Sequence, residues 1–166
     1  QVVTSTAGIA NGGSLTAIAR QGVVISGTRY EAANGKVIPS GLVSNTSNKG
    51  DAGSITIDTP NLKVLAGGEI SSSSLVGADG NGGSITIRAT DEFLVDGVDA
   101  NGKKSAIVTN TFSKGNAGTI SVSTGKAALS NGGVVFSQSE GSGKGGAILI
   151  EAASLSISNS AQLASS

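Results

Sequence analysis

The chain has 166 residues, 37% of them hydrophobic and 2% aromatic, with 26 glycines, and its 11 basic residues balance 11 acidic ones. A net charge of zero gives no field that would attract nucleic acid, and no apolar run approaches the length of a membrane span. The lack of cysteine and histidine excludes disulfides, thiolate metal sites and Ser-His-Asp or Cys-His nucleophilic catalysis.

One short phrase recurs along the chain, a glycine-rich turn followed by a short alternating strand. A degenerate copy occupies residues 11–16, and clear copies occupy residues 50–57, 80–87, 115–122 and 143–150. Equivalent glycines in successive copies are 40, 30, 35 and 28 residues apart. Self-similarity of this kind predicts a solenoid of stacked coils.

Each repeat contains three strand-like pieces. In the unit that begins at Gly50, Ile55 and Ile57 share one face of the first piece, and Leu62 and Val64 share one face of the second. The third piece carries one apolar residue followed by serine or threonine at alternate positions, and outward Ser and Thr are expected to keep the flat faces hydrated. The equivalent second-strand pairs are Phe93 and Val95, Ala127 and Leu129, and Leu155 and Ile157, and the third strands carry Ile70, Ile107, Val135 and Leu163, trailed by Ser72, Thr109, Ser137 and Ser165.

Three strands per unit with short turns predict an all-β fold, a right-handed parallel β-helix (β-solenoid) of about five triangular coils with roughly 28–40 residues per coil, in one domain over residues 1–166. Inward residues would then form ladders of rungs about 4.8 Å apart. An antiparallel sandwich is the alternative, although sandwiches do not repeat a turn phrase in register. Residues 1–6 and 161–166 both read as third strands, which predicts a segment of a longer array or a unit that stacks end to end with copies of itself.

A second periodicity relates alternate coils. Residues 42–53 align without a gap on residues 107–118, two coils further on. Long and short coils therefore alternate, and the inserted turns at residues 33–36 and 100–103 should project from the same edge of the solenoid.

Loops stacked on one edge are where solenoids usually place recognition. The sequence predicts binding loops around Asn34 and Lys36 and around Asn101 and Lys103, with Phe112 as an aromatic platform for a sugar ring. The alternative is that these loops are tolerated surface insertions.

Acidic residues are densest around the second strand of the third unit, whose glycine-rich turn begins at residue 80. Asp91, Glu92, Asp96 and Asp99 could hold Ca²⁺, with Asp91, Asp96 and Asp99 as the candidate ligands, or could supply a carboxylate pair for acid–base hydrolysis. Asp96 and Asp99 flank Gly97, however, and aspartate is common in such turns for local backbone bonding. A solvated turn is therefore the favoured interpretation.

The repeated phrase at residues 50–57, 80–87, 115–122 and 143–150, together with residues 130–133, resembles the repeats of large exoproteins related to filamentous haemagglutinin. The resemblance covers most of the chain from about residue 42 onward. It implies a right-handed β-helical passenger exported by two-partner secretion and displayed on, or shed from, a bacterial surface, often as an adhesin.

The leading hypothesis is a non-enzymatic extracellular or cell-surface solenoid that acts as a stalk or fibre and as an adhesin, with no cofactor. Its expected partners are adjacent repeats or copies of itself and surface glycans, with no nucleic acid and no membrane insertion. Alternatives are a carbohydrate-binding module that uses the stacked loops, a self-assembling filament subunit and, more remotely, a polysaccharide lyase or hydrolase.

Overall fold

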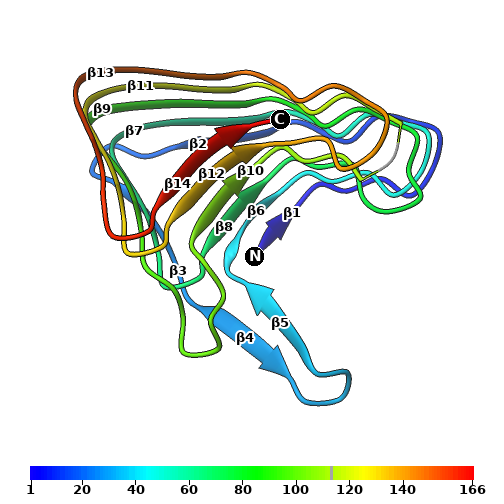
Figure 1. Cartoon of the computed structure of the whole chain (residues 1–166), viewed down its shortest axis with the longest axis horizontal. Helices are drawn as coiled ribbons and strands as arrows, with labels where there is room; N and C mark the ends of the chain where they lie inside the picture. Colours follow the sequence, from blue (N-terminus) through cyan, green and yellow to red (C-terminus); the bar gives the residue numbers. More distant parts are fainter. Residues whose placement is uncertain (113) are drawn as a thin grey trace.

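The computed structural model describes residues 1–112 and 114–166. All regular structure in these residues is β-strand, and the strands stack as a solenoid of about four turns, close to the five coils that the repeat predicts. Figure 1 shows equivalent strands of successive coils lying side by side. The strands of both walls pair in parallel, so the antiparallel sandwich is excluded.

The first wall contains the longest strands. The sequence predicts two separate strands here, but in the later coils they form one bent strand, and the register shifts at the bend, for example between Thr124 and Lys126. A bulge absorbs the extra residue, so the hydrogen-bond ladder continues past the corner. The strands of this wall are β2 (Leu15–Ile18), β3 (Val23–Ser26), β7 (Ile55–Leu65), β9 (Ile85–Asp96), β11 (Ile120–Ser130) and β13 (Ile148–Ile157), with β2 and β3 both paired to β7.

The second wall is a six-stranded parallel sheet built from the predicted third strands. Its strands are short and are added in chain order, one from each coil. They are β1 (Val2–Val3), β6 (Gly41–Val43), β8 (Glu69–Ser71), β10 (Ala106–Val108), β12 (Val134–Ser137) and β14 (Gln162–Ser165).

Apolar ladders between the walls form the core, in the register predicted from the repeat. Ile55, Ile85 and Ile120 pair directly and are fully buried. Phe93 stands between Leu62 on one side and Ala127 on the other, so a large side chain is offset by a small one and the narrow interior stays filled. The ladders end in side chains that are partly exposed, because they belong to the last rung: Leu155 (48%), Ile157 (45%) and Leu163 (36%).

The serine and threonine residues of the second wall do not all face solvent. Thr56 and Thr86 on the long strands are exposed, as predicted, but Ser72 and Ser137 share the inward face of their strands and are fully buried. The Ser72 hydroxyl donates to the carbonyl of Gly53 at 2.5 Å, and that of Ser137 donates to Gly118 at 2.6 Å. The glycine corner leaves backbone carbonyls inside the coil, and a buried carbonyl needs a donor.

A ladder of side-chain amides and one carboxylate joins the glycine-rich turns of successive coils. Asn11 Oδ1 accepts the backbone N–H of Asp51 at 3.0 Å, and Asp51 Oδ1 accepts that of Asn81 at 2.8 Å. Asn81 and Asn116 continue the pattern, each bonding to the next turn. These side chains satisfy turn N–H groups that lie between strands, which explains why Asn and Asp recur in the repeated phrase.

The two inserted segments project on one side of the solenoid, next to the second wall (Figure 1). The first is an antiparallel hairpin of β4 (Thr28–Glu31) and β5 (Lys36–Pro39). The second is a turn closed by an antiparallel bridge between Val98 and Lys104.

Candidate functional site

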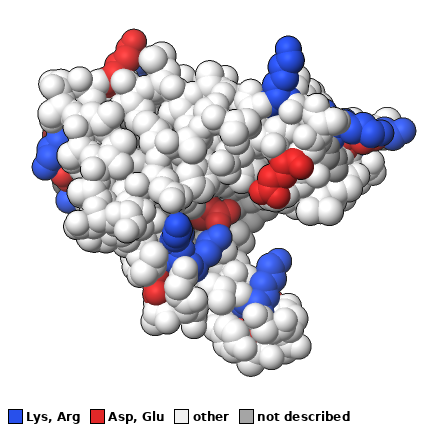
Figure 2. All heavy atoms as spheres, in the orientation of Figure 1, with Lys and Arg blue, Asp and Glu red and all other residues white. Residues whose placement is uncertain are grey.

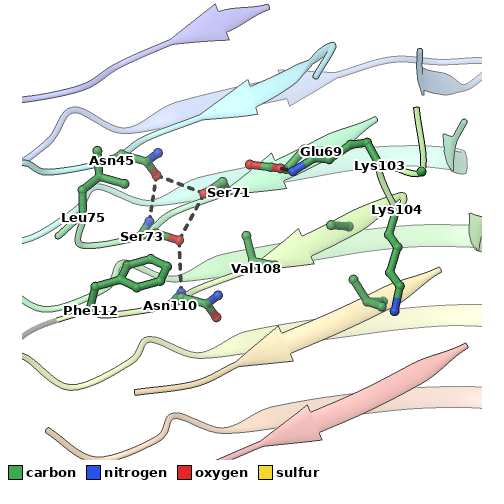
Figure 3. A pocket seen from close by; sticks show the side chains of 13 residues that line it. Asn45, Glu69, Ser71, Ser73, Leu75, Lys103, Lys104, Val108, Asn110 and Phe112 are labelled. Carbon is green, nitrogen blue, oxygen red and sulfur yellow. Dashed lines mark hydrogen bonds and ion pairs between the residues drawn. The ribbon is translucent and has the colours of Figure 1, made fainter. Parts of the chain in front are cut away.

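A groove of about 480 Å³ crosses the outer face of the second wall. Its floor is apolar, because Ala106 and Val108 point outward on β10 while Ile107 between them points into the core. Figure 3 shows this floor between an apolar pair on one side and charged side chains on the other. The groove is lined by Asn45, Glu69, Ser71, Ser73, Leu75, Gly102, Lys103, Lys104, Ala106, Val108, Asn110, Phe112 and Val134.

A row of polar side chains crosses the groove from one coil to the next (Figure 3). Asn45 Oδ1 accepts the Ser71 hydroxyl at 3.0 Å and the Ser73 backbone N–H at 2.9 Å. The Ser73 hydroxyl oxygen accepts the backbone N–H of Asn110 at 3.1 Å. Asn110 Oδ1 is buried and has no hydrogen-bond partner among the described residues. The row therefore contains one buried oxygen whose hydrogen-bonding capacity the described residues leave unused.

The charged side of the groove is mainly basic. Lys103 Nζ lies 2.7 Å from Glu69 Oε2, whereas Lys104 makes no ion pair within the part of the chain that the structure describes. A second hollow of about 300 Å³ shares Asn45, Glu69 and Lys103 with the groove and reaches Lys36 on the hairpin. The two hollows form one continuous surface with three lysines and one glutamate. In Figure 2, basic side chains gather around a hollow on the side that carries the hairpin.

An apolar patch closes the opposite side of the groove. Leu75 is 39% exposed, and the Phe112 ring lies beside it (Figure 3). The two residues belong to successive coils, because their neighbours Ser74 and Thr111 are paired in parallel. A flat aromatic ring at the edge of a polar row suits a ligand that has both an apolar face and hydroxyl groups.

The predicted loop residues divide into two groups. Lys36, Lys103 and Phe112 line the continuous surface. Asn34 and Asn101 do not, because each side-chain amide bonds within its own loop, to Glu31 at 3.0 Å and to Asp99 at 3.2 Å respectively. Asparagine in these two turns shapes the loops rather than the groove.

The acidic residues do not assemble into a metal site. The described residues contain no group of three or more acidic, histidine or cysteine side chains that could hold a metal ion, so Asp91, Asp96 and Asp99 do not form the calcium site considered from the sequence. Asp96 instead accepts hydrogen bonds from Ser130 and Asn131 in the next coil. Asp99 accepts the backbone N–H groups of Asn101 and Lys103 within its own turn, whereas Asp96 links two coils.

Glu92 is held between two lysines of the neighbouring coils. Its carboxylate lies 3.1 Å from Lys63 Nζ and 3.6 Å from Lys126 Nζ. The hydrogen bond from Lys63, reinforced by the charges of both lysines, lowers the pKa of Glu92 below its usual range. Glu92 therefore joins three coils through its contacts with the two lysines.

The Thr28 hydroxyl ties the hairpin to the second inserted loop by donating to Asp99 Oδ2. This bond is the main cause that lowers the pKa of Asp99 to about 2, and the backbone N–H groups of Asn101 and Lys103 add to it. Because the folded pKa lies below the unfolded one, Asp99 stabilises the fold above about pH 4, and this contribution is lost as the pH falls through about 2.

Replacing Thr28 with valine is expected to raise the pKa of Asp99 toward its ordinary value and to loosen the hairpin at neutral pH. NMR titration of the Asp99 carboxyl carbon measures the first effect, and amide exchange of residues 28–39 measures the second. Thr28→Ser keeps the hydroxyl and should leave both unchanged. An Asp99 pKa that stays near 2 in Thr28→Val would contradict the assigned cause.

Sequence reasoning missed the polar row of Asn45, Ser71, Ser73 and Asn110, together with Lys104. A signal for two of these residues was present, because Asn45 and Asn110 occupy the same place in the alignment of residues 42–53 with 107–118. That alignment does not show which wall carries them or that an inserted loop stands opposite. Both facts come from the path of the chain.

No family model, no curated protein and no solved structure matches this chain. Among residues 1–112 and 114–166, no helix is long and apolar enough to cross a membrane. The chemistry of the groove is therefore the observation from which a function follows.

Proposed function

We propose that this chain is a non-enzymatic β-solenoid module of a secreted or bacterial cell-surface protein, which binds glycans in the groove of its second wall and acts as part of an adhesive stalk. The observation that carries the proposal is the groove itself. It combines an aromatic ring, an apolar floor, a row of amides and hydroxyls, and basic side chains within one surface.

A sugar ring matches this combination of groups. Its hydroxyls both donate and accept hydrogen bonds, as does the side-chain amide of Asn110. Its C–H face can pack on Phe112. The volume of the groove, about 480 Å³, lies within the range usual for sites that bind small ligands. Lys103 and Lys104 additionally favour sugars that carry a carboxylate or sulfate group.

The scaffold suits adhesion because the groove is built on strands rather than on long loops alone. β8 and β10 each pair with a strand on both sides, so the floor is held in place by the ladder of the whole wall. Side chains on such elements keep their geometry without a cost in ordering when the ligand binds. Stacking of the end coils on adjacent repeats or on copies of the chain remains a prediction, supported by the exposed Leu155, Ile157 and Leu163.

Replacing Phe112 with alanine is expected to weaken glycan binding about tenfold, since loss of one aromatic stacking contact costs about 1.4 kcal/mol. The wild-type protein is first applied to an array of plant, microbial and animal oligosaccharides, and the retained sugars are then titrated by calorimetry. Tyr30→Ala is the matched control, because Tyr30 is 60% exposed on the hairpin and does not line the groove.

Three results would overturn the proposal. If no sugar on the array binds, glycan binding is contradicted. If Phe112→Ala and Tyr30→Ala weaken the binding of a sugar equally, the groove is not the binding site. Shortening of a bound polysaccharide by the wild-type protein, abolished in Asp91→Ala or Asp96→Ala, would show the lyase or hydrolase alternative to be correct.

A further inference from the structure

The polar row of the groove repeats with the period of two coils. Val43, Ser71 and Val108 are paired in register across β6, β8 and β10. Asn45, Ser73 and Asn110 stand two residues further along each strand and therefore form one column. The two asparagines occupy equivalent positions, two coil spacings or about 9.6 Å apart along the solenoid axis.

Both asparagines present hydrogen-bonding atoms that the described residues leave unused. The Asn45 side-chain oxygen is taken by Ser71 and Ser73, which orients the amide and leaves its nitrogen without a partner among the described residues. Asn110 Oδ1 is buried and unpartnered within the same part of the chain. Buried polar atoms are almost always bonded in folded proteins, so an unpartnered one beside a groove points to a ligand or water.

The groove crosses successive strands of the second wall, in the direction of the solenoid axis. It begins beside Val134 on β12, crosses β10 and β8, and continues through Asn45 into the second hollow beside Val43 of β6 and Lys36 of the hairpin. A ligand that lies along the groove crosses the strands at right angles. In each coil it meets one residue of the column formed by Asn45, Ser73 and Asn110. A straight, extended ligand can follow this path.

We infer that the groove takes a linear glycan with an extended β-1,4-linked backbone, which lies along the solenoid axis with alternate sugars hydrogen-bonded to Asn45 and Asn110. In such a chain each sugar is turned by about half a rotation from the last, so every second sugar presents the same groups to one side. The distance over which this pattern repeats is close to two coil spacings. This inference rests on the proposed glycan-binding function and narrows its ligand class.

Binding should therefore depend on both linkage and chain length. The probes are β-1,4-linked glucose and N-acetylglucosamine oligomers from disaccharide to hexasaccharide, with α-1,4-linked glucose oligomers of the same lengths as curved counterparts. Calorimetry should show the affinity for at least one β-linked series rising about tenfold between disaccharide and tetrasaccharide, as the second asparagine is reached. The α-linked series should show no such rise.

Asn110→Ala should remove the increment in affinity between disaccharide and tetrasaccharide. Asn34→Ala is the matched control, since Asn34 bonds within its own hairpin and lies outside the groove. Thermal melting of each variant checks that it is folded. The linkage and length series on the wild-type protein needs no variant, so the inference can be tested even if Asn110→Ala does not fold.

The outcomes separate this inference from the proposed function. Glycan binding that does not depend on chain length would contradict a ligand lying along the solenoid axis, and so would equal binding of the α- and β-linked series. Either result would leave the proposed glycan-binding function in place. An unchanged length increment in folded Asn110→Ala would overturn the role of the asparagine column. Failure of every oligosaccharide to bind would overturn both.

Discussion

Replacing Gly118 with alanine is expected to lower the free energy of unfolding by at least about 3 kcal/mol, or to prevent folding altogether. A Cβ atom at this position would overlap the carbonyl oxygen of Gly83, which lies in the coil beneath. Both groups belong to the backbone, so no side-chain rotation can relieve the clash. Urea denaturation followed by circular dichroism measures the loss.

Gly13→Ala is the matched control, because Gly13 occupies the equivalent corner of the first coil. A Cβ there would lie 3.5 Å from the nearest atom, Thr4 Cβ, which is an ordinary contact. Its effect should stay within about 0.5 kcal/mol of zero. Equal and small losses in the two variants would show that successive coils do not approach each other through their glycine corners.

Phe93→Ala is expected to cost about 3–5 kcal/mol of stability. Phe93 is fully buried, and it is the largest side chain in the core. Its ladder neighbours are Leu62 and Ala127, and neither can move into the space, because each is held in register by a parallel strand. The variant should therefore keep a cavity, and its urea midpoint should fall.

Phe136→Ala makes the same change on the outward face of β12. Phe136 is only half-buried and follows the inward-facing Val135, so the loss should be roughly half that of Phe93→Ala or less. A comparable loss in the two variants would mean that the core does not lie between the walls as described.

Much of the fold could be predicted from the sequence because the inward positions repeat. A shift of one residue would turn Ile55, Ile85 and Ile120 outward together, so only one register buries all three. The pairing of Leu62, Phe93 and Ala127 follows from the same spacing. The fusion of the first two predicted strands into one bent strand in the later coils could not be predicted. Inward and outward residues alternate in the same way before and after the bulge, so the sequence pattern does not show whether the strand is interrupted there.

The candidate site could be predicted only in part. Lys103 and Phe112 were identified because they stand in or beside an insertion that recurs two coils apart. The inward position of Ser72 could not be foreseen, since its burial depends on a carbonyl that the glycine corner leaves inside the coil. Asn45 and Asn110 were aligned, but only the pairing of β6, β8 and β10 places them in one column across a groove.

The order in which this protein folds should follow from the parallel register of its walls. Each strand pairs with its equivalent one coil earlier, as β9 pairs with β7 and β11 with β9, so no pairing has to wait for a distant part of the chain. Once one coil has closed, it offers a template to which the next can add, and the costly step is the first closure. A growing or emerging chain can therefore gain structure progressively, one coil at a time, in the direction in which it becomes available.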